Sequence, residues 1–278
     1  MYQDDVRDYY DYTLDLYKVF WHGDTRAIHY GIWGESTKDL YDALLNTNRF
    51  LADSANVQSG EKVLDAGCGV GGSSFWLAKN KNVRVVGITI SKKQLDKAKE
   101  LAARFDLEKQ TEFYLQDYTK TSFSDASFDI VWAIESVCHA EDKSAFLKEA
   151  YRLLRSGGRL AIADGFLERL PRNQVEEKKL KSFIKGMALD NLAQSASFEN
   201  ALNESGFKNI KNLDKTEAIL PTAIKMARMS RWSWPVSVFT TWLHITPKLL
   251  AANNRAGIDQ LYLFKNRLLS YRIFVAEK

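Results

Sequence analysis

The chain has 278 residues, of which 45% are hydrophobic, and its formal net charge is +4. This composition can bury a substantial core and excludes a largely disordered chain. No run reaches the 18 uncharged apolar residues of a membrane-spanning helix, and the acidic start MYQDDVRDYYDYTLDLYKVF lacks an apolar signal region, so we predict a cytoplasmic protein without a membrane span.

The positive charge is concentrated near the end of the chain. Residues 221–278 contain nine Lys or Arg residues against Asp259 and Glu277, which gives this segment a net charge of +7. Such an excess can attract an anionic substrate or a nucleic acid. The basic residues are interleaved with apolar ones rather than clustered, so solvated helix faces are the favoured interpretation.

Short apolar runs alternate with helical segments up to Gly165. In chain order we predict a helix over 38–55, a strand over 61–67, a helix over 72–80, a strand over 83–90, a helix over 92–106, strands over 111–117 and 128–136, a helix over 143–158 and a strand over 158–166. This order predicts parallel strands joined by right-handed crossovers, with a ligand at their carboxyl ends. The core is therefore an α/β, doubly wound sheet.

The pattern after Gly165 is mainly helical. Helices over 176–192, 197–205 and 222–269 surround a strand near 209–217, and a strand over 270–278 ends the chain. Breaks are expected at Pro221, Pro235 and Pro247. We divide the chain into an N-terminal helical lid (1–37), a ligand-binding core (38–165), and a helical cap with the last two core strands (166–278). The cap is expected to close a pocket.

The glycine loop lies in VLDAGCGVGGSS. Gly67, Gly69 and Gly72 fit the G-x-G-x-x-G pattern of dinucleotide-binding proteins. Asp65, however, would repel a pyrophosphate, whereas it would attract the ammonium and sulfonium of S-adenosylmethionine (SAM). The second strand ends in GITIS, without the acid that binds the ribose of NAD and that is also usual in SAM sites. The charge pattern favours SAM, with an NAD-dependent oxidoreductase as an alternative.

Four motifs carry a family resemblance. LDAGCGVGGSSFWLAKN, GITISKKQ, FDIVWAIESVCHAEDK and LRSGGRLAIAD follow one another as in the class I SAM-dependent methyltransferases. The chain resembles in particular the subgroup of the tocopherol, sterol and cyclopropane-fatty-acid methyltransferases. The resemblance covers residues 30–165 and the last strand. It implies a Rossmann-like, seven-stranded, mostly parallel sheet whose last strand is antiparallel, a helical cap after strand 5, and SAM as cofactor with S-adenosylhomocysteine as product.

The resemblance also implies a cofactor site. Ile88, Thr89 and Ile90 would line the ribose and adenine, and Asp117 would meet the adenine amine. The implied set is Tyr30, Trp33, Asp65, Ala66, Gly67, Gly69, Gly71, Ile88, Thr89, Ile90, Gln94, Asp117, Tyr118 and Ile134. Alternatives stay open, because the acids can order turns, Gln94 can be an exposed helix residue, and Tyr30 and Trp33 can be ordinary packing aromatics.

Three residues are candidates for catalysis. Methyl transfer needs alignment of donor and acceptor more than a powerful catalytic group, but a hydroxyl or ammonium acceptor also needs a base. His139 follows the fourth strand and Asp164 ends the fifth, where a parallel sheet delivers side chains to a ligand. We predict His139 as base or acceptor-orienting group, assisted by Asp164 and Glu135. The alternatives are a backbone-bonded histidine, a turn acid, and a Glu135 that only holds the cap or cofactor.

The expected substrate is a small molecule. Aromatic residues gather in the cap, mostly as core and partly as faces for an apolar or amphipathic acceptor: Trp232, Trp234, Phe239, Trp242, Tyr262 and Phe264. Methylation of carbon, oxygen or nitrogen on a natural-product or isoprenoid- or lipid-like molecule is predicted. A nucleic-acid methyltransferase and a SAM-binding protein that catalyses cyclisation or rearrangement are the alternatives.

The sequence predicts neither a metal site nor disulfides. Cys68 and Cys138 have neither metal-ligand spacing nor a disulfide framework, and are expected to be buried free thiols. The oligomeric state is left open, a homodimer being one alternative.

Overall fold

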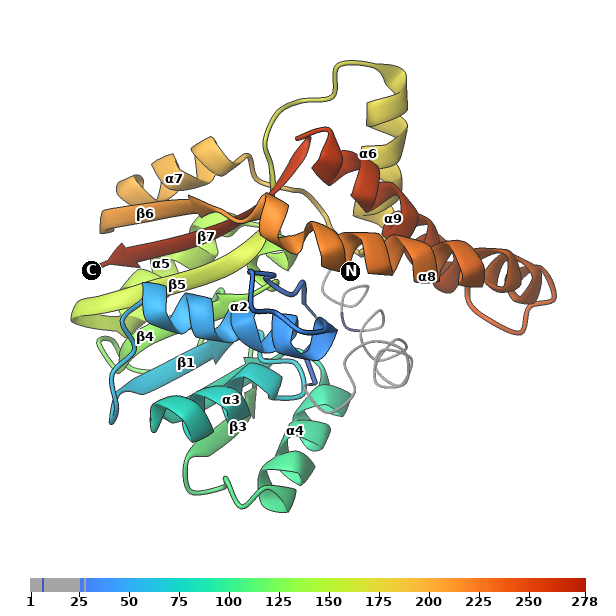
Figure 1. Ribbon diagram of the computed structural model, residues 1–278. Helices are drawn as coiled ribbons and strands as arrows, with labels where there is room; N and C mark the ends of the chain where they lie inside the picture. Colours follow the sequence, from blue (N-terminus) through green and yellow to red (C-terminus); the bar gives the residue numbers. More distant parts are fainter. Residues whose placement is uncertain (1–6, 8–25, 28) are drawn as a thin grey trace.

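The computed structural model describes residue 7, residues 26 and 27, and residues 29–278 (Figure 1). These residues contain a seven-stranded sheet of order β3-β2-β1-β4-β5-β7-β6. Strand β7 runs antiparallel to β5 and β6, and the other pairs are parallel. The strands are β1 (Lys62–Ala66), β2 (Arg84–Thr89), β3 (Thr111–Leu115), β4 (Phe128–Ile134), β5 (Leu154–Leu167), β6 (Lys208–Asp214) and β7 (Leu269–Glu277). The predicted sheet is confirmed.

Helices cover both faces of this sheet. They are α2 (Leu40–Ser54), α3 (Gly72–Lys81), α4 (Lys92–Arg104), α5 (Lys143–Leu153), α6 (Gln174–Gly186), α7 (Ser195–Glu204), α8 (Thr216–Trp242) and α9 (Lys248–Lys265), with the short 3-10 turn η3 (Val137–His139). Because successive strand residues point to opposite faces, Val63 packs in the same cluster as Leu77 of α3, while Leu64 packs with Phe146 of α5. Burial on both faces explains the nearly continuous apolar runs of the central strands.

The cap is a helical hairpin with a third helix against it. Helices α8 and α9 pack together and extend away from the sheet, and α6 packs on α9 (Figure 1). They lie on the side of the sheet toward which the parallel strands point, as expected for the cap (Figure 1).

The breaks expected at Pro221 and Pro235 were wrong, because both prolines lie inside α8. A proline inside a helix removes one backbone hydrogen bond and leaves a carbonyl without its usual donor. Both prolines are exposed, so water can reach the freed carbonyls. Pro247, as the residue before α9, does mark a boundary.

In the segment before α2, Arg7 is helical, whereas residues 26, 27 and 29–37 are not. Of the predicted lid over 1–37, residues 1–6, 8–25 and 28 lie outside the described residues. Residues 29–37 run alongside α2 and α8, and the backbone N–H of Ile32 donates to Ala43 O at 3.0 Å while that of Trp33 donates to Ala218 O at 2.9 Å. This segment ties the core to the cap.

We expect Gly186→Ala to lower the free energy of unfolding by about 1–3 kcal/mol, because it overpacks the contact between α6 and α9. A Cβ at Gly186 would lie 2.3 Å from Ala252 O and 2.6 Å from Ala256 Cβ. Gly34→Ala is the matched control, since its Cβ would meet only Thr37 Oγ1 at 4.0 Å. Denaturant melts should show a change within about 0.5 kcal/mol for the control. Equal stability of the two variants would contradict this packing.

Candidate active site

The loop between β1 and α3 brings bare backbone to the carboxyl end of the sheet. Gly67 has φ +88°, a left-handed conformation that strains any residue with a side chain. A Cβ at Gly67 would also lie only 2.5 Å from Ser136 Cβ, in the loop after β4. Glycine at this position therefore permits both the turn and the close approach of two loops.

A cavity of about 350 Å³ lies at this end of the sheet, at the lower end of the size range of ligand pockets. The loops that follow β1, β2, β3 and β4 form most of its wall. Eleven of the predicted site residues line it: Asp65, Gly67, Gly69, Thr89, Ile90, Gln94, Asp117, Tyr118, Ile134, Glu135 and His139. Strand ends that are far apart in sequence thus share one pocket.

Asp65 supplies a buried carboxylate to this wall. Its Oδ2 accepts a hydrogen bond from Ser74 Oγ at 2.6 Å, which fixes the carboxylate against the first turn of α3. Burial raises the pKa of Asp65 to about 6, although the bond from Ser74 opposes the shift. A cation in the cavity would favour the ionised carboxylate and lower this pKa.

Gln94 lies in the first turn of α4, next to the end of β2, where the sequence lacks the usual ribose-binding acid. Thr89 Oγ1 donates to Gln94 Oε1 at 2.7 Å and so fixes the orientation of the buried amide. Gln94 Nε2 would lie 4.0 Å from a Cβ built on Gly69, which directs the amide donor toward the glycine loop. A neutral hydrogen-bond donor therefore lines the cavity at this point.

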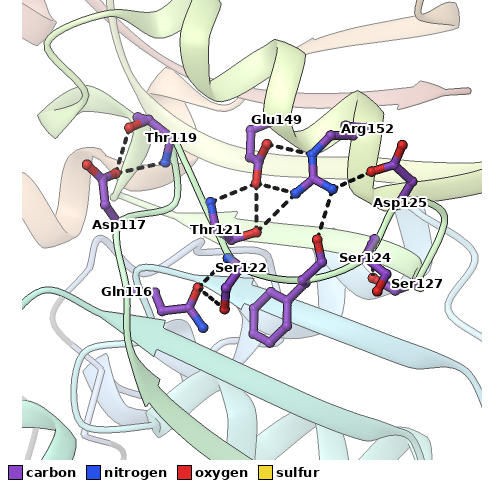
Figure 2. Close-up of polar contacts among 11 residues, drawn as sticks. Gln116, Asp117, Thr119, Thr121, Ser122, Ser124, Asp125, Ser127, Glu149 and Arg152 are labelled. Carbon is purple, nitrogen blue, oxygen red and sulfur yellow. Dashed lines mark hydrogen bonds and ion pairs between the residues drawn. The ribbon is translucent and has the colours of Figure 1, made fainter.

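The loop after β3 is anchored to α5, as Figure 2 shows. Asp117 Oδ1 accepts from both the backbone N–H and Oγ1 of Thr119 at 2.8 Å. Thr121 donates from its backbone and hydroxyl to Glu149 Oε1, and Arg152 pairs with the same carboxylate. Asp117 thus orders a turn and also lines the cavity.

Glu135 lies at the end of β4 in a strained backbone conformation, with φ +47°. Its Oε1 accepts from the backbone N–H of Tyr30 at 2.6 Å and from the Tyr271 hydroxyl at 2.9 Å. Burial, with the nearby charge of Asp164, raises the pKa of Glu135 to about 8. Strain of this kind persists where the surroundings impose it, which is common at functional sites.

His139 lines the same cavity as a neutral ring. Its Nδ1 lies 3.3 Å from Ala188 O, so we assign the proton to Nδ1 and leave Nε2 as an acceptor. Burial lowers the pKa of His139 to about 4. The ring is therefore a weaker base than its ordinary pKa suggested.

Asp164 lies behind the cavity wall and is not among the residues that line it. Its Oδ2 accepts from the backbone N–H of Cys138 at 2.9 Å, and its Oδ1 accepts from Gly165 N–H at 2.7 Å. Burial raises the pKa of this carboxyl to about 6. Asp164 therefore holds the turn that carries His139.

Five predicted cofactor residues also lie outside the lining: Tyr30, Trp33, Ala66, Gly71 and Ile88. The Tyr30 hydroxyl donates to Gln260 Oε1 at 2.7 Å, and Trp33 Nε1 donates to Thr222 Oγ1 at 2.8 Å. Both aromatic side chains therefore connect to the cap helices. The predicted cap aromatics are likewise not among the residues that line the cavity. Phe264 is buried, while Trp232, Phe239 and Trp242 are exposed.

Comparison with known proteins identifies the family. The model of the methyltransferase domain matches residues 64–162. Methyltransferase GfsG of Streptomyces halstedii is 33% identical over 220 residues, which are 78% of this chain and 78% of GfsG. The chain belongs to the SAM-dependent methyltransferases. This methyltransferase is also 33% identical over 217 residues to cycloartenol-C-24-methyltransferase of Arabidopsis thaliana, covering 77% of the chain and 63% of that relative.

The fold comparison agrees with the sheet order. The cyclopropane synthase MmaA2 from Mycobacterium tuberculosis superposes with a TM-score of 0.86 at 18% identity, covering 99% of this methyltransferase and 98% of MmaA2. Because the chain belongs to the SAM-dependent methyltransferases, SAM is its cofactor, and the alternative of an NAD-dependent oxidoreductase is wrong.

The cavity of this methyltransferase fits SAM. A carboxylate at Asp65 matches the ammonium of the cofactor, and the backbone of Gly67 and Gly69 lines the cavity beside it. The amide of Gln94 offers a donor for a ribose hydroxyl. Donors and charges of the kinds that SAM requires thus occur around one cavity.

We expect Gln94→Ala to weaken SAM binding about tenfold, because the variant loses a hydrogen bond in a buried site. Isothermal titration calorimetry would measure Kd. Lys93→Ala is the neighbouring control, since Lys93 is exposed on α4 and does not line the cavity. An unchanged Kd in Gln94→Ala would show that the amide does not contact the cofactor.

Several residues of the cavity wall were missed. Arg26, Ala27 and His29 line it from a segment that no core motif includes, so the sequence offers no signal for them. Ser136 and Glu141 belong to the loop that carries His139, and extending the prediction along that loop would have found them. Tyr271, which binds Glu135, comes from the last strand.

Proposed function

We propose that this methyltransferase transfers the methyl group of SAM to a small apolar or amphipathic molecule bound beside Glu135 and His139. The observation that carries the proposal is that these two side chains line the same cavity as Asp65 and the glycine loop. A donor held by the loop would lie within reach of an acceptor held by the other two residues, and alignment of this kind supplies much of the rate of a direct displacement.

The cofactor would be held from three strand ends. We assign its amino-acid end to Asp65 and the backbone at Gly67 and Gly69, its ribose to Gln94, and its adenine to the loop of Asp117. When bound, SAM supplies an electrophilic methyl group on a sulfonium. The carboxylate of Asp65, which is buried, then offsets this positive charge.

Glu135 is the group best suited to take a proton or to offset charge that develops on the acceptor. Its carboxylate is held by Tyr30 and Tyr271, and its raised pKa places its ionisation close to neutral pH. His139, with its lowered pKa, would instead accept a hydrogen bond from the acceptor and orient it. Asp164 acts as a positioning residue through the turn of Cys138.

The acceptor class follows from the chemistry of the site and from the relatives. The Arabidopsis relative is named for cycloartenol. We propose a natural-product, isoprenoid- or lipid-like acceptor, methylated on carbon, oxygen or nitrogen. Free Cys68 and Cys138 fit a reducing compartment, so we keep the cytoplasm as the location.

An acceptor screen tests the proposal. The purified chain would be incubated with SAM and with panels of terpenoids, sterols, prenylated phenols, small amines and RNA, and S-adenosylhomocysteine release would be measured. We expect turnover with at least one apolar small molecule, and a product heavier by one methyl group. Turnover with RNA alone, or an isomerised product without S-adenosylhomocysteine, would contradict the proposal in favour of one of the alternatives.

A further inference from the structure

The outer end of the cap hairpin exposes large apolar side chains. Trp232 is 86% exposed, Trp242 is 70% exposed and Ile245 is 69% exposed. Val236, Val238, Phe239 and Leu243 are exposed in the same stretch. We call the seven residues the hairpin tip. Contiguous exposed apolar surface of this kind marks an interaction site more often than chance exposure does.

The tip continues a stripe along the outer side of α8. Residues three or four apart share one side of a helix. The exposed residues that recur at this spacing are Lys225, Arg228, Trp232, Val236, Phe239 and Leu243. Ala223, Ala227 and Ser230, on the opposite side, are buried, and Ser230 packs at Gly257 of α9. One side of α8 therefore builds the hairpin, and the other presents a basic half followed by an apolar half.

The sequence of the hairpin around the tip carries positive charge only. From Ala218 to Ile258 the sequence has no Asp or Glu, but it has Lys225, Arg228, Arg231, Lys248 and Arg255. Arg255 pairs with Asp259. Among the described residues, no salt bridge involves the other four, all of which are exposed.

We propose that the hairpin tip docks on the surface of an anionic phospholipid bilayer. Tryptophan rings favour the interface between headgroups and acyl chains, and basic side chains beside them are attracted to anionic headgroups. None of the described helices combines the length and hydrophobicity needed to cross a membrane, so the hairpin would lie in the interface. A second copy of the chain fits less well, because two tips brought together would oppose their positive charges.

The base of the hairpin is connected to the cavity wall. Thr222, near the base of α8, accepts a hydrogen bond from Trp33 and donates one to Gly31 O. The segment that contains Gly31 and Trp33 also provides His29 to the cavity wall. The base of α8 is thus joined to the active site. The docking itself does not depend on the proposed function.

Vesicle binding tests the proposal. The full chain would be co-sedimented with phosphatidylcholine vesicles with or without one quarter phosphatidylglycerol, at low and high salt. We expect at least tenfold stronger partitioning onto the anionic vesicles, a blue shift of tryptophan fluorescence, and weakening by salt. The variant Trp232→Ser/Phe239→Ser/Trp242→Ser and the variant Lys225→Gln/Arg228→Gln/Arg231→Gln should each lose at least tenfold.

The matched control is Tyr41→Ser/Leu170→Ser, because Tyr41 is 50% exposed and Leu170 is 68% exposed and neither belongs to the hairpin tip. It should bind vesicles like the unmodified chain. All three variants should keep the Tm of the unmodified chain. Binding that fails on every vesicle, or that is equal in the tip variant, overturns the proposal. A lower Tm of the tip variant, or a dimer that only this variant loses, overturns it by showing that protein covers the tip.

Discussion

Glu135→Gln is expected to lower kcat by about 100-fold to 1,000-fold, a much larger effect than its weakening of SAM binding. The substitution preserves the size of the side chain and leaves an oxygen for the Tyr30 N–H and the Tyr271 hydroxyl. It removes the negative charge and the capacity to take a proton. Glu141→Gln is the control, because Glu141 lines the same cavity but is exposed, and its variant should lose less than about threefold.

The pH profile separates this role from a structural one. With the pKa of Glu135 raised to about 8 in the cofactor-free protein, its ionised form increases with pH, so kcat/KM for SAM should rise toward pH 8. The sulfonium of bound SAM favours the carboxylate form of Glu135. The rise of kcat with pH should therefore occur at lower pH than the rise of kcat/KM. In Glu135→Gln, both kcat/KM and kcat should lose this dependence on pH. Full turnover with an unchanged profile in this variant would remove Glu135 from the mechanism.

Gly67→Ala is expected to weaken SAM binding at least 100-fold. A side chain at this position meets a left-handed backbone and Ser136 at once, so the glycine loop and the loop after β4 must separate. Both loops form the cavity wall, and a displacement there removes several contacts with the cofactor together. Calorimetric titration with SAM would measure the loss.

Gly60→Ala isolates the effect of backbone strain. Gly60 has φ +86°, close to that of Gly67, but a Cβ there would meet nothing within 4 Å. We expect this variant to lose about 1 kcal/mol of stability and to bind SAM normally. If Gly60→Ala and Gly67→Ala weakened binding equally, general destabilisation would explain both results, and the glycine loop would have no special part in the site.

The sequence predicts well what depends on neighbours along the chain. The strands from β1 to β5 were predicted because each is a short apolar run between helical segments. Asp65 lies near the end of β1 and Gly67 follows its last residue, so their place at the cavity follows from the strand alone. His139 and Glu135 belong to the loop after β4 and reach the cavity by the same rule.

Contacts between distant segments could not be predicted in this way. Tyr30 binds Gln260 and Trp33 binds Thr222, and local sequence does not specify such pairs because the partners lie about two hundred residues away. That these aromatics fold over the cofactor stays a prediction. The lowered pKa of His139 results from burial, which also depends on the assembled fold. The exposed prolines of α8 show that a local breaking signal can be overridden by a helix that packs on its other side.

A crystal structure of the chain with S-adenosylhomocysteine bound is the most direct test of the active site. We predict that the ligand occupies the cavity at the ends of β1–β4, with its amino group at the Asp65 carboxylate, its ribose at Gln94 and its sulfur facing Glu135 and His139. A ligand bound elsewhere on the protein, or one whose amino group lies away from Asp65, would contradict the assignment.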